Sequence, residues 1–231
     1  MSSPKHLRST NRVMSIDILG LMTRLATDRP VFHSEADFQH ALAWRIHVEH
    51  PTARIRLETR PERRIRLDLL VALAEERVAI ELKYLVRRTT VQLDGELFDL
   101  PNQAAQDISR HDFIKDIGRV ERFVSDGIAN SGWAIALSND PSYWNASTKL
   151  DPVDALFRIH EGRELAGSLS WSALAGRGTT KNRDVPLDLS ANYVCRWRDY
   201  SKISGPRKTM DFRYLAVEVR AKHSATTPLT G

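Results

Sequence analysis

Two neighbouring apolar segments that carry charged residues limit most strongly what this chain of 231 residues can fold into. They span residues 64–73 and 77–86, and a short charged break joins them. Their length and apolar content predict two adjacent strands of a buried sheet. Asp68, Glu81 and Lys83 nevertheless interrupt the two segments. These charges need an explanation, because a charge on a buried strand destabilises the fold unless it has a partner.

The place of each charge within its strand decides whether the three side chains can meet. Side chains alternate between the two faces of a strand, so Glu81 and Lys83 share one face. In one hairpin register Asp68 lies opposite Lys83, and a shift by two residues puts it opposite Glu81 instead. Either register gathers all three charges on one face, whereas a slip by one residue separates them.

The rest of the chain predicts a succession of helices and strands. The clearest helix begins after Ser34, a good N-cap residue, and ends before Pro51. The predicted elements, in chain order, are a short helix at 13–25, this helix at about 34–50, strands at about 53–59, 64–73 and 77–86, a loop or short hairpin at 87–100, a long amphipathic helix at about 102–125, and a fourth strand in the segment GWAIALSND.

Composition narrows the class of protein. The formal net charge of +5 and the pI of about 9.5 suit an anionic partner such as nucleic acid, although many basic proteins bind none. The single cysteine, Cys195, cannot form an intramolecular disulfide, which fits a reducing compartment. No apolar run reaches the length of a membrane span, and Asp17 interrupts the first apolar stretch. We therefore expect a cytoplasmic protein without a membrane partner.

Glu35 adds a fourth charge to the argument. It lies on the same side of its helix as the apolar stripe formed by Phe38 and Leu42. A carboxylate in the first turn is also a common partner of the helix dipole, so this simpler interpretation stays open. For the strand charges, two explanations remain: a structural ion-pair cluster, or a divalent cation such as Mg²⁺, which prefers carboxylate oxygens.

At these residues the chain resembles the PD-(D/E)XK superfamily of restriction-endonuclease-like nucleases. The family signature is an acidic residue in one strand followed by Glu/Asp-x-Lys in the next, here Asp68 and the segment Glu81–Lys83. The family often adds a Glu on the preceding helix, matched by Glu35. The order helix, three strands, helix, strand over about residues 31–140 is that of the family's common core. The match departs from the pattern at Leu67, where the signature has proline.

The resemblance implies an α/β fold with a restriction-endonuclease-like core, in which helices flank a mixed central sheet, plus a C-terminal β-rich extension. The expected divisions are an N-terminal arm and short helix (1–30), the nuclease-like core (31–145), an α+β extension packed on the core (146–222) and a disordered tail (223–231).

The resemblance also implies roles for individual residues. Asp68, Glu81 and the carbonyl of Leu82 would ligate Mg²⁺ or Mn²⁺, with Glu35 as an accessory ligand. Lys83 would orient or activate water and stabilise charge on the phosphate.

Basic and amide side chains near these residues are candidate contacts to nucleic acid, against the alternative of a solvated surface. They are Arg64, Arg66, Arg87, Arg88, Gln103, Gln106, Lys115 and Arg119. The glycine-rich basic segment AGRGTTKNRD is either a flexible surface loop or a further backbone contact.

The function expected from this pattern is a metal-dependent nuclease, an endonuclease or exonuclease, that hydrolyses phosphodiester bonds, with DNA favoured over RNA by family analogy. A homodimer stays open, since many relatives cut both strands as dimers. Two alternatives remain: a catalytically silent nucleic-acid-binding or assembly module, and a structural protein whose charges form an ion-pair network.

Overall fold

The computed structural model describes residues 16–62, 65–204 and 209–221 of the chain. The outer part of the predicted N-terminal arm, the candidate residue Arg64 and the predicted tail at 223–231 lie outside the described residues.

A mixed six-stranded sheet forms the centre of the molecule, with the strand order β1-β2-β3-β6-β10-β9. In that order the bounds are Arg54–Glu62, Ile65–Leu73, Glu76–Leu85, Ser131–Ser138, Thr209–Arg220 and Trp197–Ser204. Only β3 and β6 run parallel, and the helix α3 (Gln106–Ser125) lies between them in the chain. Every other neighbouring pair of this sheet is antiparallel. The α/β class and the mixed central sheet predicted from the sequence are confirmed.

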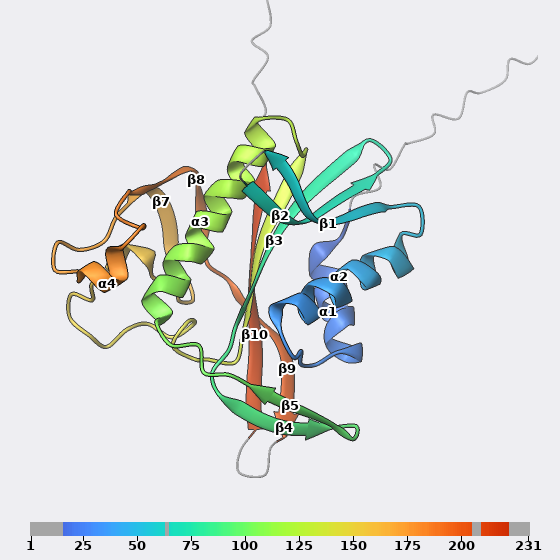
Figure 1. Cartoon of the computed structure of the whole chain (residues 1–231), viewed down its shortest axis with the longest axis horizontal. Coiled ribbons are helices and arrows are strands. Elements are labelled where there is room, and N and C mark those ends of the chain that lie inside the picture. Colours follow the sequence, from blue (N-terminus) through green and yellow to red (C-terminus); the bar gives the residue numbers. More distant parts are fainter. Residues whose placement is uncertain (1–15, 63–64, 205–208, 222–231) are drawn as a thin grey trace, which may run out of the picture.

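Helices cover both faces of this sheet (Figure 1). The helices α1 (Ile18–Asp28) and α2 (Glu35–Glu49) pack on one face, where Leu21, Phe38 and Leu82 belong to one buried apolar cluster. The helix α3 crosses the other face, where Phe113 and Ile117 pack against strands β6 and β10. Each helix thus buries one apolar stripe against the sheet, as its hydrophobic periodicity predicts.

Local signals in the sequence explain where α2 begins. The Ser34 side chain accepts a hydrogen bond from the backbone N–H of Asp37 at 3.2 Å, as an N-cap residue does. The Asp37 side chain in turn accepts one from the backbone N–H of His33 at 3.0 Å. These bonds fix the first turn of α2, and with it the direction in which Glu35 points.

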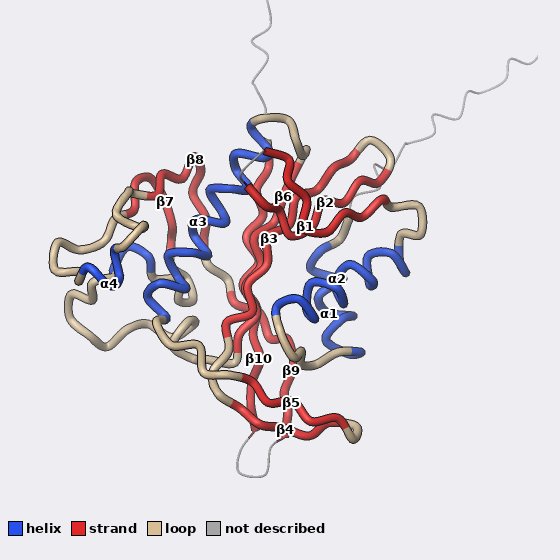
Figure 2. The backbone as a smooth tube through the Cα atoms, in the orientation of Figure 1, coloured by secondary structure: helices blue, strands red, loops and turns tan. Residues whose placement is uncertain are grey.

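Two small antiparallel ribbons lie outside the central sheet (Figure 2). The first is a hairpin of β4 (Thr89–Leu93) and β5 (Glu96–Leu100), which lies at the same end of the molecule as the lower ends of β9 and β10. The second pairs β7 (Glu164–Leu169) with β8 (Leu187–Val194) and lies beyond α3. The short helices η1 (Ala155–Phe157) and α4 (Arg177–Thr180) belong to the same region.

The central sheet continues past the division predicted at residue 146. Strands β9 and β10, which follow this position, pair directly with the core as far as β6. Only the intervening region, including β7 and β8, is an addition to the core. The long connection before β9 hid this pairing, because contacts between strands distant in the chain leave no local pattern in a sequence.

Candidate functional site

The candidate site forms where strands β2 and β3 separate. Their pairing runs from Leu73–Glu76 to Leu69–Ile80, and one further step of this register brings Asp68 opposite Glu81. Asp68, Glu81 and Lys83 therefore share one face. The register is the one in which Asp68 lies opposite Glu81, not the one in which it lies opposite Lys83. Beyond that point the edge of β3 has no strand partner in β2, so its backbone groups are free to bind side chains.

Two carboxylates occupy this free edge. The backbone N–H of Leu82 donates to Asp68 Oδ2 at 2.7 Å, and the N–H of Tyr84 donates to Glu35 Oε2 at 2.9 Å. Asp68 reaches the edge from β2, and Glu35 reaches it from the first turn of α2. Because the N–H and C=O of a strand residue point to the same side, the Leu82 carbonyl also faces this edge. That carbonyl accepts a hydrogen bond from Lys83 Nζ at 3.1 Å.

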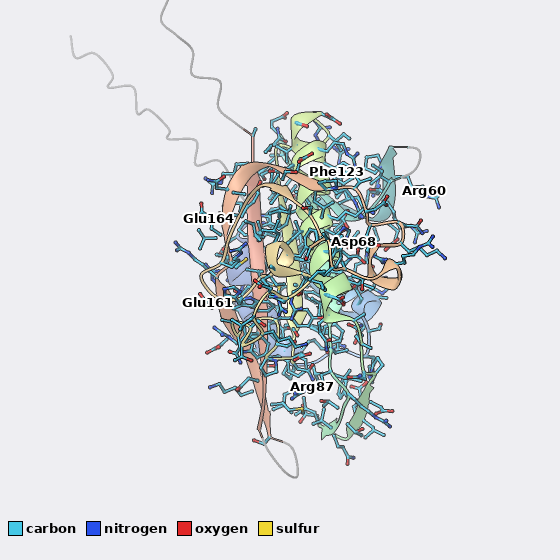
Figure 3. The ribbon with its side chains drawn as sticks, turned by 90° about the vertical axis from the view of Figure 1, so that its left-hand side faces the viewer. Arg60, Asp68, Arg87, Phe123, Glu161 and Glu164 are labelled. Carbon is cyan, nitrogen blue, oxygen red and sulfur yellow. The ribbon has the colours of Figure 1, made fainter. Side chains whose placement is uncertain are left out.

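The helix α3 supplies the remaining charges. Asp116 lies 2.8 Å from Lys83 Nζ and 3.1 Å from an Arg119 nitrogen, with its side chain only 3% exposed. Arg119 also contacts Glu81 Oε1 at 2.9 Å. Figure 3 looks onto the side of the molecule that carries α3, and Asp68 lies alongside this helix near the middle of the view.

We call the four acids of this site the carboxyl cluster. Its members are Glu35, Asp68, Glu81 and Asp116. The cations in contact with the cluster are Lys83 and Arg119. Fully ionised, four acids and two cations carry a net charge of −2. This excess has to be met by protons, by a bound cation, or by solvent.

Burial and mutual repulsion raise the pKa of these acids. Loss of hydration, followed by repulsion from Asp116 and Asp68, raises the pKa of Glu81 to about 9, against the opposing attraction of Arg119. The pKa of Asp116 is also raised, first by burial, although Lys83 and Arg119 oppose the shift. Burial likewise raises the pKa of Asp68 and that of Glu35. The cluster therefore holds its negative charge at a cost in free energy.

For Lys83, the neighbouring charges outweigh the effect of burial on the pKa. Burial alone would lower the pKa of its ammonium group, but the charges of Asp116, Glu35 and Asp68 outweigh that effect and raise it above its ordinary value. Lys83 is therefore a cation at neutral pH. It can donate hydrogen bonds to water or to a phosphate oxygen, but it cannot accept a proton there.

The donor set fits a hard divalent cation by its chemistry, because it consists of carboxyl oxygens and one strand carbonyl. In the described residues, however, no three His, Cys, Asp or Glu side chains converge in an arrangement that holds a metal ion. Contacts to protein groups explain this: Arg119 engages Glu81, and the N–H of Leu82 engages Asp68. An ion would have to share or replace the contact of Arg119.

Sequence reasoning missed Asp116 and Glu58. Asp116 lies within the apolar stripe of α3, one residue before Ile117. An acid on the apolar face of a helix is the same signal that identified Glu35, so it could also have identified Asp116. The pairs Leu57–Leu69 and Thr59–Leu67 place Glu58 opposite Asp68.

Glu58 is held to the site through its neighbours. It contacts Arg66 at 2.9 Å, and the Gln39 amide donates both to Glu58 and to the Asp68 carbonyl, at 3.1 and 2.8 Å.

The candidate nucleic-acid contacts separate into two groups. Arg119 lies in the site, Lys115 lines a cavity beside it, and the Arg66 backbone carbonyl accepts a hydrogen bond from Arg119 at 3.4 Å. The second group lies near the end of β3 and the β4–β5 hairpin.

In this second group Gln103 bonds to the Val86 N–H, and Gln106 bonds to Asp140 at 3.3 Å. The hydrogen bonds of both Gln side chains thus go to the end of β3 and to Asp140, away from the carboxyl cluster. Arg87, adjoining exposed Arg88, lies well away from Asp68 (Figure 3).

Comparison with known proteins identified no relative of this chain. No family model, no curated protein and no solved structure matches the chain. The resemblance of the site to a nuclease motif therefore rests on the residues of this chain alone. Among the described residues, no helix combines the length and the apolar character needed to cross a membrane.

Proposed function

We propose that the protein is a metal-dependent nuclease that hydrolyses phosphodiester bonds, with DNA as the favoured substrate. The observation that carries the proposal is the carboxyl cluster, in which four acids meet two cations of the described residues, built on the free edge of β3 beside Lys83. The preference for DNA rests on analogy with the PD-(D/E)XK family.

The proposed ligands are oxygens at the free edge of β3 and beside it. They come from Asp68, Glu81 and the Leu82 carbonyl, with Glu35 as an accessory group. When bound there, Mg²⁺ or Mn²⁺ would act as a Lewis acid on the phosphate and lower the pKa of a bound water. The residues of the chain would position that water and the phosphate between the two strands and α3.

Lys83 contributes positive charge in this proposal. Because its pKa is raised, the ammonium group stays protonated and donates to a phosphate oxygen as negative charge develops during hydrolysis. Its contact with Asp116, at 2.8 Å, fixes the direction of the flexible side chain. Asp116 is thus a positioning residue for Lys83.

The ion-pair network is the second candidate, favoured by the chain of contacts from Glu81 through Arg119 and Asp116 to Lys83. This network would stabilise the packing of α3 on β3 without any reaction. It accounts for Asp68 and Glu35 only as acceptors for the backbone N–H groups of Leu82 and Tyr84, although both acids add to the repulsion within the cluster.

Incubation with nucleic acid tests the proposal. Supercoiled plasmid, linear duplex, single-stranded DNA and RNA are each incubated with the protein in Mg²⁺ or Mn²⁺ and in EDTA. We expect metal-dependent cleavage by the wild type and a loss of at least about 100-fold in D68N and K83M, because each removes charge stabilisation from the transition state.

Matched variants at exposed sites control for the change of charge. D211N and K202M alter an exposed acid and an exposed lysine of β10 and β9, outside the cluster, and should cleave as the wild type does. Equal cleavage by the wild type, D68N and K83M would show that the activity belongs to a contaminant. Absence of cleavage on every substrate, with all variants folded, would favour the ion-pair network.

A further inference from the structure

A cavity of about 320 Å³ opens beside the carboxyl cluster, between α3 and the turn that follows α4. Its lining residues are polar or charged without exception: Lys83, Asp112, Lys115, Asp116, Arg119, Asn182 and Arg183. Three of these residues, Lys83, Asp116 and Arg119, also belong to the candidate site. The cavity is therefore a direct continuation of that site.

The charge of this lining favours an anion. Lys83, Asp116 and Arg119 are shared with the carboxyl cluster, so the lining adds two cations, Lys115 and Arg183, and one acid, Asp112. Asp112 contacts Arg183 at 3.1 Å, and Asp116 contacts Lys83 and Arg119. Lys115 is exposed and makes no ion pair with any described residue. A ligand in the cavity would thus meet an unmatched ammonium group beside a fixed guanidinium.

Several contacts hold Arg183 in place. Its backbone N–H donates to the Thr180 carbonyl at 2.7 Å, and its own carbonyl accepts from the Trp171 indole at 2.9 Å. Asn182, just before it, adopts a left-handed backbone (φ 61°), which Asn tolerates better than most residues. The guanidinium therefore approaches the cavity from a constrained turn, and little freedom is lost when a ligand binds.

The lining also indicates which part of a ligand would be bound. No aromatic ring and no large apolar side chain faces the cavity, so it offers no surface on which a base would stack. Lys and Arg side chains are the usual partners of phosphate oxygens, and such contacts carry no sequence information.

We propose that this cavity binds a backbone phosphate of the nucleic-acid strand, next to the phosphate that is hydrolysed at the carboxyl cluster. The proposal rests on the proposed function and deepens it. It gives the region between β7 and β8 a role: Asn182 and Arg183 complete one wall of the substrate path. Contact at this phosphate would be independent of sequence.

Binding without metal tests the proposal separately from catalysis. Fluorescence anisotropy with labelled 20-nucleotide single-stranded DNA, duplex DNA and RNA is measured in EDTA over a series of salt concentrations. K115Q removes the unmatched ammonium group, and R183Q removes the guanidinium. We expect each variant to bind every sequence about fivefold more weakly, with a salt slope lower by about one.

K202Q is the matched control, since Lys202 is exposed on β9 and does not line the cavity. It should bind as the wild type does. R183Q also loses the contact with Asp112, so thermal unfolding of each variant is recorded. K115Q loses no ion pair with a described residue, so the binding result for K115Q decides the test. The polymer that binds most tightly identifies the source of the phosphate.

Different results would refute the phosphate site and the nuclease activity. If K115Q and wild type bind alike with the same salt slope, the phosphate site is refuted, whether or not the protein cleaves. If binding depends on Lys115 and Arg183 but no substrate is cut in metal, the phosphate site stands and the nuclease proposal falls.

Discussion

The charge of Glu81 depends strongly on its surroundings. It is 1% exposed, it faces Arg119 at 2.9 Å, and two further acids repel it. Its contact with Arg119 favours the ionised form, but burial and repulsion together dominate, so its pKa lies above neutrality. At this single position the chain either takes up a proton or requires additional positive charge.

The pH dependence of stability should reveal this balance. The folded pKa of Glu81, about 9, is higher than the ordinary value of 4.5, so stability from the neutral acid is fully present below 4.5 and is lost as pH rises towards 9. E81Q stays neutral throughout. In EDTA, its free energy of unfolding should therefore increase relative to wild type between pH 5 and 9, by at most about 1.4 kcal/mol per pH unit.

Urea denaturation at pH 5, 7 and 9 measures this difference. E75Q, at an exposed position in the β2–β3 turn, is the matched control and should follow the wild type. A constant difference between E81Q and wild type across this range would mean that the Glu81 pKa is not raised.

Arg119 should compete with a divalent cation for Glu81. R119Q removes the guanidinium that now contacts Glu81 and Asp116. In EDTA this leaves buried acids without their partner and should destabilise the protein by about 1–3 kcal/mol. In calorimetric titrations R119Q should bind Mn²⁺ about tenfold more tightly than wild type, because the site loses one positive charge.

R196Q, at an exposed arginine away from the site, controls for the change in net charge. Weaker Mn²⁺ binding by R119Q than by wild type would show that Arg119 supports the ion instead of competing with it.

At the scale of elements, the approach of α3 to the sheet decides whether Asp116 and Arg119 reach the strand charges. Gly132 in β6 permits this approach. A Cβ atom there would overlap the Val120 side chain of α3 and lie 2.8 Å from the Ala79 carbonyl oxygen of β3. A larger residue must therefore push α3 away from the sheet.

G132A should destabilise the protein by about 1–3 kcal/mol, because an added methyl group in a close-packed contact forces its neighbours to move. G118A is a matched glycine substitution on α3, where the new Cβ would meet only Leu189 at 4.0 Å. It should stabilise the protein by about 0.5–1 kcal/mol through helix propensity. Thermal or urea unfolding measures both, and equal effects of the two substitutions would contradict this packing.

The site was predictable from the sequence where it depends on strand periodicity. Alternation placed Glu81 and Lys83 on one face, and the short hairpin restricted Asp68 to the same face. Asp116 depends instead on how α3 crosses the sheet, which is set by contacts such as Gly132–Val120. Contacts of this kind join segments far apart in the chain, so no local pattern reports them.

At the scale of the whole molecule, the central sheet needs both ends of the chain. β10 pairs with β6 along eight positions, from Arg213–Ser138 to Arg220–Ser131. Without β9 and β10, β6 would become an open edge, and buried residues on both faces of the sheet would meet water. The predicted core at 31–145 is thus too short to close its own sheet.

A chain ending at Asn145 should therefore fail to unfold cooperatively in urea, as followed by circular dichroism. A chain ending at Ala221 retains every described strand and should unfold as the full chain does. A cooperative transition in the shorter chain would show that residues 1–145 are an independent domain.

Calorimetric titration with Mn²⁺ at neutral pH, on the wild type and D68N, is the most direct measurement of what the carboxyl cluster is for. We predict one ion bound per wild-type chain and an affinity at least about tenfold weaker in D68N, because that variant loses a charged ligand. Wild-type protein that takes up no ion, or equal affinity in both proteins, would contradict the assignment of this site as a metal centre.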